Sequence, residues 1–281
     1  MGAPPPQHVL TAFGVPADQG LTPLAGALEQ SAWRAGSVVL KPVQAPNPGE
    51  AEWVAAVLDV IVEDGFRVIE PVCAANGGWL EDGWTAWRWF EGDHERRAWR
   101  DVMAAATAFH RAVPAAIAAA GVDARPAWID TRSHRWARAE ATVWHGAPLP
   151  PTLNTNQLEN SLYERAVALG PPLTSQERAE AQVVHGDIAS NALRLHDGAA
   201  IALIDMSPGW RTPGSVGVQI AVEAVTWFHG DPALLDGLPR ADLARACAFR
   251  LLCGLQASDD WERDFPRELA RWTRTLELID A

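Results

Sequence analysis

Apolar and polar positions follow a strand-like pattern in the first third of the chain. Residues 37–43 are rich in β-branched side chains and end at a proline-containing loop, which predicts a strand. Apolar residues then recur on one helical face over 50–62, and Gly65 ends this predicted helix. Residues 66–69 predict a further strand, and tryptophan-rich runs within 79–90 predict a hairpin. We therefore expect a β-rich region that contains one helix.

The pattern changes to helical spacing in the rest of the chain. A long amphipathic helix is predicted over 94–113, and residues 114–175 should hold two or three helices with proline-rich connections. Two short strands are predicted at 192–195 and 200–204, joined by an Asp-Gly turn. The remainder, up to the C-terminus, is predicted to be helical.

These elements predict an α+β protein made of two lobes. A small β-rich lobe would comprise residues 1–90 and a larger helical lobe residues 91–281, with a short connector between them. A cleft between two lobes is the default place for a small-molecule ligand. We therefore expect the functional residues to converge from both lobes.

Composition narrows the classes of partner and compartment. The formal net charge of −12 disfavours nucleic acid and anionic membrane as partners. No uninterrupted apolar run reaches the roughly 18 residues that a membrane span needs, and the first residues do not have the pattern of a secretory signal. The three cysteines are scattered, which argues against a disulfide framework and favours a cytoplasmic location. The oligomeric state is left open.

One basic residue stands out from the others. Lys41 is the single lysine among the 23 lysines and arginines of the chain. A lysine presents a compact point charge, whereas an arginine presents a broad planar fork. Lys41 lies on a predicted strand, and we interpret it as a candidate for a role that arginine cannot fill.

The strongest chemical signal lies in two acidic segments. The first, 185–191, reads His-Gly-Asp-Ile-Ala-Ser-Asn, and the second, 204–208, contains Asp205. Because a predicted hairpin joins the two segments, Asp187, Asn191 and Asp205 should share one small volume. Carboxylate and amide oxygens suit Mg²⁺, and a second carboxylate that is free of metal could accept a proton from a hydroxyl. This set is what phosphoryl transfer needs, since the protein mainly positions the reactants and neutralises their charge.

These motifs resemble those of a known family. The segments 185–187 and 204–205, together with Asn191, look like the catalytic and metal-binding signatures of aminoglycoside phosphotransferases and choline-kinase-like enzymes. The stretch 33–41 looks like the nucleotide loop and lysine strand of the protein-kinase-like fold that these enzymes share. Combined with residues 205–211, it is similar to an actinobacterial branch of the superfamily.

The resemblance implies a role for each matching residue. Asp187 would be the base that orients the acceptor hydroxyl, and Asn191 and Asp205 would bind Mg²⁺. Lys41 would contact the phosphates of ATP or GTP. Glu52 would form an ion pair with Lys41, with Glu50 as the alternative partner. Backbone groups that hydrogen-bond the nucleobase would come from the connector residues Arg88, Trp89, Phe90 and Glu91.

Two departures from the family pattern keep a second function open. Three residues separate Asp187 from Asn191, where the family usually has four, and the predicted phosphate loop at 24–31 holds a single glycine. A phosphate approaches the backbone more closely where glycine is present. The main hypothesis is a kinase acting on a hydroxyl of a small, amino-containing metabolite or antibiotic. The alternative is a catalytically silent nucleotide-binding or regulatory module; a protein kinase is disfavoured because no Ala-Pro-Glu anchor follows Asp205.

Other polar residues are interpreted more conservatively. We expect His185 to support the loop through hydrogen bonds, and we expect Trp210 to lie near the acceptor. Glu223, Asp259 and Asp260 could contact a cationic acceptor, but a structural or solvated carboxylate is the simpler interpretation.

Overall fold

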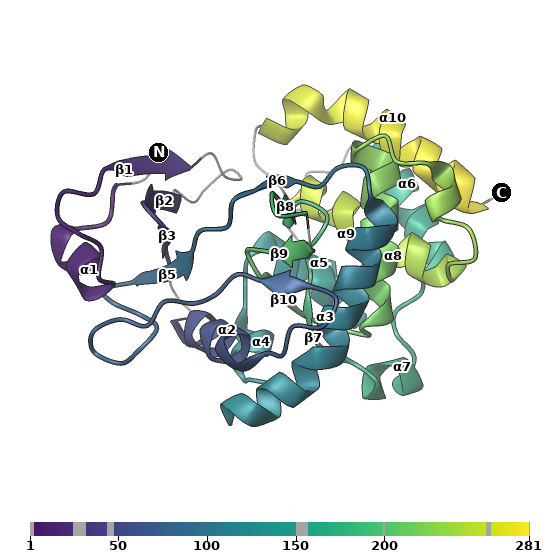
Figure 1. Cartoon of the computed structure of the whole chain (residues 1–281). Coiled ribbons are helices and arrows are strands. Elements are labelled where there is room, and N and C mark those ends of the chain that lie inside the picture. Colours follow the sequence, from purple (N-terminus) through teal and green to yellow (C-terminus); the bar gives the residue numbers. More distant parts are fainter. Residues whose placement is uncertain are drawn as a thin grey trace.

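The chain folds into a small β-rich part and a larger helical part (Figure 1). The structure, a computed structural model, describes residues 3–24, 32–43, 48–149, 157–198, 200–256 and 260–280. The predicted phosphate loop at 24–31 lies almost entirely outside the described residues, and so does Asp259.

The first sheet is antiparallel and forms the β-rich part. Its strands, in spatial order, are β1 (Leu21–Leu24), β2 (Ala32–Ala35), β3 (Val38–Pro42) and β5 (Trp84–Arg88). Helix α1 (Gln7–Ala12) contributes Val9 and Leu10 to the small core that packs on this sheet with Leu40 and Ala86. The pairing of β3 with β5 places Lys41 opposite Thr85.

Helix α2 (Pro48–Val60) packs mainly on the helical part. Its residues Trp53 and Val57 belong to the large core that also contains Phe109 of helix α3 (Trp99–Ala120). The indole Nε1–H of Trp53 donates a hydrogen bond of 2.9 Å to the carbonyl oxygen of Asp123. The first third of the chain is thus divided between two cores.

A second sheet combines strands from distant parts of the sequence. Its order is β4 (Arg67–Val68), β9 (Ile201–Leu203), β8 (Ala192–Leu195) and β6 (Gly92–His94). β4 pairs with β9 in parallel, while β8 runs antiparallel to both β9 and β6. A further two-stranded sheet pairs β7 (Gln182–His185) with β10 (Pro208–Arg211).

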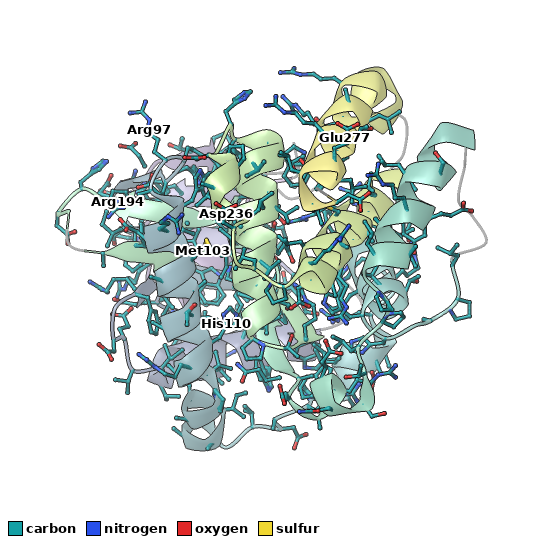
Figure 2. The ribbon with its side chains drawn as sticks, turned by 90° about the vertical axis from the view of Figure 1, so that its right-hand side faces the viewer. Arg97, Met103, His110, Arg194, Asp236 and Glu277 are labelled. Carbon is teal, nitrogen blue, oxygen red and sulfur yellow. The ribbon has the colours of Figure 1, made fainter. Side chains whose placement is uncertain are left out.

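Helices surround these two small sheets and complete the larger part. Besides α2 and α3 they are α4 (Trp128–Thr131), α5 (Arg135–Val143), α6 (Gln157–Leu169), α7 (Ser175–Ala179), α8 (Gly214–Trp227), the 3₁₀ helix η1 (Pro232–Leu234), α9 (Arg240–Leu255) and α10 (Asp260–Asp280). Met103 and His110 lie on the side of α3 that faces α8 (Figure 2).

Helix α3 is apolar and long enough to cross a membrane if length and composition alone are considered. In this fold it is a core helix instead. Trp99, Val102, Phe109 and Val113 are each at most 3% exposed and pack inside the large core. Burial of an apolar face is the usual source of stability for such a helix.

The predicted strands at 37–43, 66–69, 192–195 and 200–204 are confirmed as β3, β4, β8 and β9. The prediction of a first hairpin strand at the start of 79–90 is wrong. Within 79–83, Glu81 alone pairs with β5, through an isolated bridge to Trp84. Asn76 holds the preceding chain in a turn through its hydrogen bonds to Gly78 and Glu81.

The long helix predicted to begin at residue 94 begins at Trp99 instead. Residues 92–94 are drawn into the second sheet as β6, where they pair with β8. The Glu95 carboxylate then accepts hydrogen bonds from the backbone N–H groups of Arg97 (2.8 Å) and Ala98 (2.9 Å), just before the helix starts. An acid at this position stabilises a helix N-terminus.

We predict that Glu95→Gln lowers the stability of the fold. Burial alone would raise the pKa of Glu95, but the N–H groups of Ala98 and Arg97 and the Arg194 guanidinium lower it to about 2. The side chain is 11% exposed, so the substitution should cost about 2–3 kcal/mol of unfolding free energy at pH 7.

Denaturant unfolding at several pH values checks this prediction. A carboxyl with a lowered pKa stabilises the fold fully above about pH 5, and this contribution disappears as the pH falls towards about 2. The difference in unfolding free energy between wild type and Glu95→Gln should therefore shrink as the pH falls from about 5 to about 2. Asp101→Asn is the control, since Asp101 pairs with the same Arg194 but is 60% exposed and should cost less than about 1 kcal/mol. A difference that does not depend on pH would contradict the assignment.

Candidate active site

Two strand pairings bring the acidic segments together. In the β7–β10 pair, the N–H of Gly186 donates to the carbonyl oxygen of Ser207 at 2.7 Å. In the β8–β9 hairpin, the N–H of Ile204 donates to the carbonyl oxygen of Asn191 at 2.9 Å. Segments 185–191 and 204–208 therefore lie side by side, as the sequence predicts.

His185 connects these two segments at their centre. Its Nε2–H donates to the carbonyl oxygen of Ile204 at 3.0 Å, and its Nδ1 accepts from the backbone N–H of Asp187 at 3.3 Å. The side chain is buried, and burial lowers its pKa, which keeps the ring neutral, as this donor–acceptor pattern requires. Its expected role as a support for the loop agrees with these contacts.

A second histidine holds the end of strand β7. His110 Nδ1–H donates to the carbonyl oxygen of Ala106 at 2.6 Å, and its Nε2 accepts from the backbone N–H of His185 at 2.9 Å. Burial and the nearby His185 lower the pKa of His110 to about 3. The neutral ring therefore anchors the loop to α3.

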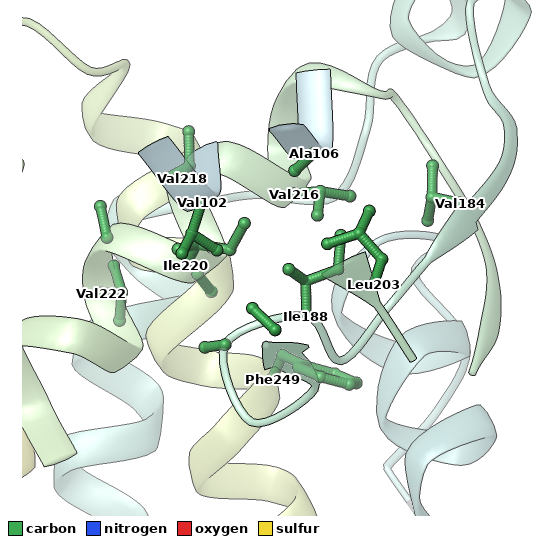
Figure 3. Close-up of a cluster of buried hydrophobic side chains, with 14 of the residues drawn as sticks. Val102, Ala106, Val184, Ile188, Leu203, Val216, Val218, Ile220, Val222 and Phe249 are labelled. Carbon is green, nitrogen blue, oxygen red and sulfur yellow. The ribbon is translucent and has the colours of Figure 1, made fainter. Parts of the chain in front are cut away.

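The middle of the loop is fixed by burial. Ile188 and Ala189 are each 1% exposed, and Figure 3 shows Ile188 close to Leu203 and Phe249 in the core beside α8. The carbonyl oxygen of Ala189 accepts from the Arg96 guanidinium at 3.0 Å. The three-residue spacing between Asp187 and Asn191 thus forms a packed, hydrogen-bonded turn.

Gly186 is required by a close approach of Arg211. A Cβ atom at position 186 would lie 2.6 Å from the Arg211 Nη2 atom and 3.3 Å from the carbonyl oxygen of Ser207. Arg211 is fully buried against Trp144 and pairs with Glu140 at 3.4 Å. Any side chain at position 186 would therefore displace either the arginine or the loop.

Asp187 is partly accessible and is held on both carboxylate oxygens. Oδ1 accepts from the Arg250 Nη2 atom at 2.5 Å, and Oδ2 accepts from the Asn191 Nδ2 atom at 3.2 Å. The same Nδ2 atom donates to the backbone carbonyl of Asp187 at 2.7 Å. This orientation leaves the Asn191 amide oxygen without a hydrogen bond among the described residues.

Asp205 pairs with the single lysine of the chain. The distance from Lys41 Nζ to Asp205 Oδ1 is 2.7 Å, and the side chains are 20% and 56% exposed. Loss of hydration alone would raise the pKa of Asp205, but the charge and hydrogen bond of Lys41 lower it below its usual range. Asp205 also has a φ of 53°, a conformation that non-glycine residues rarely adopt and that is frequent at functional sites.

The donor set fits a magnesium ion. The Asp205 carboxylate is ionised and accessible, and the Asn191 amide oxygen is free, so two hard oxygen ligands are available. Among the described residues no group of three or more His, Cys, Asp or Glu side chains could hold a metal. A site with few protein ligands is typical of Mg²⁺ that is also bound by nucleotide phosphates and water.

The predicted ion pair between Lys41 and Glu52 is wrong. Lys41 pairs with Asp205, and Glu52 is exposed on α2. The neighbouring residue Trp53 enters the core, so the register of α2 points position 52 outward. The alternative partner, Glu50, makes no ion pair with Lys41 among the described residues; burial raises its pKa and the nearby Arg132 partly offsets this.

Two of the four connector residues use their backbone N–H groups within the protein. The N–H of Arg88 donates to Glu70 (2.8 Å), and the N–H of Trp89 donates to Ser37 (2.9 Å). Phe90 packs on the small cluster formed by Leu193, Leu195 and Ala202. The N–H groups of Phe90 and Glu91 make no hydrogen bond in the described part of the chain, so a ligand could use either donor.

A buried charge network behind Asp187 was not anticipated from the sequence. Glu223 of α8 is a structural carboxylate and not a solvated one, since it is 0% exposed and pairs with Arg250 of α9 at 2.6 Å. The sequence signal for such a buried pair is a lone charged residue within an apolar helical stretch. Glu223 stands in the run Ile-Ala-Val-Glu-Ala-Val, and Arg250 stands in the run Ala-Phe-Arg-Leu-Leu.

Two surface hollows lie away from Asp187. The larger, of about 440 Å³, lies between η1, the start of α9 and the end of α10. The smaller, of about 290 Å³, is lined by Trp89, Phe90 and His196 on the connector. Neither includes Lys41, Asp187 or Asp205, so the location of the chemistry rests on the polar contacts described above.

Comparison with solved structures identifies the fold. Spectinomycin phosphotransferase APH(9)-Ia in complex with ADP and spectinomycin is 11% identical, with 98% of this chain and 96% of that chain covered and a TM-score of 0.57. The GDP and kanamycin complex of APH(2")-IIIa is 14% identical, with 97% and 95% covered and a TM-score of 0.53. A microcompartment-associated aminopropanol kinase is 18% identical, with 98% and 95% covered and a TM-score of 0.55.

At these identities the likeness establishes the fold alone, which is the protein-kinase-like fold with a β-rich first part and a helical second part. A search of curated protein sequences gave no match. The model of the phosphotransferase enzyme family, APH, matches residues 20–206, which is 187 of the 281 residues. Because this match covers more than half of the chain and includes Asp187, Asn191 and Asp205, the chain belongs to the APH phosphotransferase family.

Proposed function

We propose that this chain is a kinase that transfers the γ-phosphate of ATP or GTP to a hydroxyl group of a small molecule. The observation that carries the proposal is the convergence of four polar residues from three separate segments. Lys41 contacts Asp205 at 2.7 Å, Asn191 contacts Asp187, and the β8–β9 hairpin joins the two acidic segments. Phosphoryl transfer requires such a set of a base, metal ligands and a phosphate-binding cation.

Each residue has a defined task in this reaction. Asp187 presents a partly exposed carboxylate that orients the acceptor hydroxyl and accepts its proton. Asn191 and Asp205 would hold Mg²⁺, which supplies positive charge to the nucleotide phosphates when bound. Lys41 lies at the Asp205 carboxylate and would contribute its positive charge to the phosphates. The transition state is stabilised because these charges are in place before the reaction starts.

The nucleotide would bind between β3 and the connector. The free N–H of Phe90 can donate to a nucleobase, and Lys41 of β3 extends towards Asp205 from the first sheet. Spectinomycin phosphotransferase has been solved in complex with ADP, and APH(2")-IIIa in complex with GDP. These relatives support a purine nucleotide as the co-substrate and leave both ATP and GTP to be tested.

The acceptor class that we propose is a small alcohol, with amino alcohols and amino sugars first. The similar structures are named for spectinomycin, kanamycin and aminopropanol as bound molecules or substrates. The negative net charge of this chain suits a cationic acceptor. Glu223 is not available for such recognition, because it is buried and paired with Arg250. We place the reaction in the cytoplasm, in keeping with the three free cysteines.

Turnover on a panel of acceptors tests this function. Purified protein is incubated with Mg-ATP or Mg-GTP and with amino sugars, amino alcohols, other small alcohols and a generic protein substrate, and nucleoside diphosphate release is measured. We expect turnover with at least one small alcohol and none with protein. Binding of nucleotide without turnover on any acceptor would favour the silent nucleotide-binding module instead.

We predict that Asp187→Asn abolishes turnover and leaves nucleotide binding intact. The amide cannot accept the hydroxyl proton, so kcat should fall by about 10³-fold, while calorimetry should give a Kd for Mg-nucleotide within about threefold of wild type. Asp236→Asn is the control, since Asp236 is an exposed acid. Equal loss of turnover and binding would count against the role of a base.

We predict that Asp205→Asn weakens nucleotide binding only when magnesium is present. The substitution removes the one ionised metal ligand, so the Kd for Mg-ATP or Mg-GTP should rise at least about tenfold. Titrations of wild type and variant with and without Mg²⁺ measure the effect. An unchanged magnesium dependence would show that the metal ligand is misassigned.

A further inference from the structure

Arg250 lies directly behind the candidate base. It belongs to α9, far from the catalytic loop in sequence, and its side chain is 7% exposed. Its Nη2 atom donates to Asp187 Oδ1 at 2.5 Å, and its Nε atom donates to Glu223 Oε1 at 2.6 Å. One guanidinium therefore serves a reactive carboxylate on one side and a buried carboxylate on the other.

The buried side of this network is tied to the same loop. Gln219 of α8 donates from Nε2 to Glu223 Oε1 at 2.6 Å and to the carbonyl oxygen of Gly186 at 2.8 Å. Its Oε1 accepts from the Arg211 Nη1 atom at 2.5 Å, which fixes the orientation of the amide. The backbone next to Asp187 and the side chain of Asp187 are thus held by one set of contacts.

The guanidinium is also confined by aromatic rings. Its central carbon lies 5.4 Å from the ring centres of both Trp227 and Phe249. These contacts favour the cation and restrict how its plane can turn. A planar fork with a fixed plane can orient a carboxylate, whereas a freely rotating ammonium cannot.

We propose that Arg250 is a positioning residue that holds the Asp187 carboxylate in the orientation needed for phosphoryl transfer, with Glu223 as its buried counterion. This inference rests on the proposed kinase function. It assigns to Arg250 a role beyond compensating the charge of Glu223. With Oδ1 held by Arg250 and Oδ2 near Asn191, the carboxylate has a single orientation towards an incoming hydroxyl. A displacement of about 1 Å in such a site can reduce the rate by about 10²-fold.

A charge-neutral double variant separates the positioning of Asp187 from the compensation of the Glu223 charge. Arg250→Gln combined with Glu223→Gln removes the cation together with its buried counterion, so no unpaired charge remains in the core. The positioning role predicts a folded protein with kcat reduced by about 30- to 100-fold and a nucleotide KM within about twofold of wild type. A purely structural role predicts that restoring charge balance restores kcat.

The matched control comes from the same helix. Arg245 is likewise buried, at 4% exposed, and it also has two carboxylate partners, Glu177 at 2.8 Å and Asp242 at 2.7 Å. The double variant Arg245→Gln/Glu177→Gln removes a buried arginine together with one of its carboxylate partners, and neither residue contacts Asp187. Its kcat should stay within about threefold of wild type. An equal loss of kcat in both double variants would overturn the positioning role.

Two further measurements keep the test decisive. Arg250→Lys retains the charge beside Glu223 if the double variant does not fold, and its single donor atom should leave kcat at least about tenfold lower. A crystal structure of whichever variant folds should show the Asp187 carboxylate rotated away from Asn191. An unmoved carboxylate, or kcat within threefold of wild type, would overturn the proposal. If wild type binds nucleotide but turns over no acceptor, the kinase function is refuted instead. The crystal structure of the variant would then still show whether Arg250 orients the Asp187 carboxylate.

Discussion

The neutral imidazole of His185 sets the separation between the two segments that carry the acidic residues. It donates to Ile204 on one side and accepts from the N–H of Asp187 on the other, so it needs one protonated and one free nitrogen. Burial keeps the ring in that state, and His110 links the backbone N–H of His185 to α3. The loop conformation, the position of Asn191 next to Ile204 and the pairing of Asp205 with Lys41 all depend on this fixed separation.

Much of the fold and of the site could be predicted because their signals are local. The β-branched run around Lys41, the helical periodicity of α2 and the turn between β8 and β9 lie within short windows of sequence. The hairpin then implies the closeness of Asn191 and Asp205. Strands β6 and β10 gave no such signal, since they are short and form only because β8 and β7, distant in sequence, offer partners.

The remainder could not be predicted because it depends on long-range pairing of charges. Glu52 and Asp205 were both reasonable partners for Lys41 by residue type, and the choice between them depends on which face of α2 is buried. Arg250 reaches Asp187 from 63 residues away, and nothing in the sequence near either residue specifies that contact. The lone charges inside α8 and α9 indicate only that a partner exists, since a buried charge without one is costly.

The parallel pairing of β4 with β9 attaches part of the first 90 residues to the helical part of the molecule. The chain between α2 and β4 is attached to the helical part by backbone hydrogen bonds and by core packing, although it precedes the connector in sequence. The unit that can rotate as a body is therefore smaller than the first 90 residues and comprises α1 and the sheet that carries Lys41. The chain connects this unit to the rest of the molecule three times, and three covalent connections restrict any rotation of the unit to few directions.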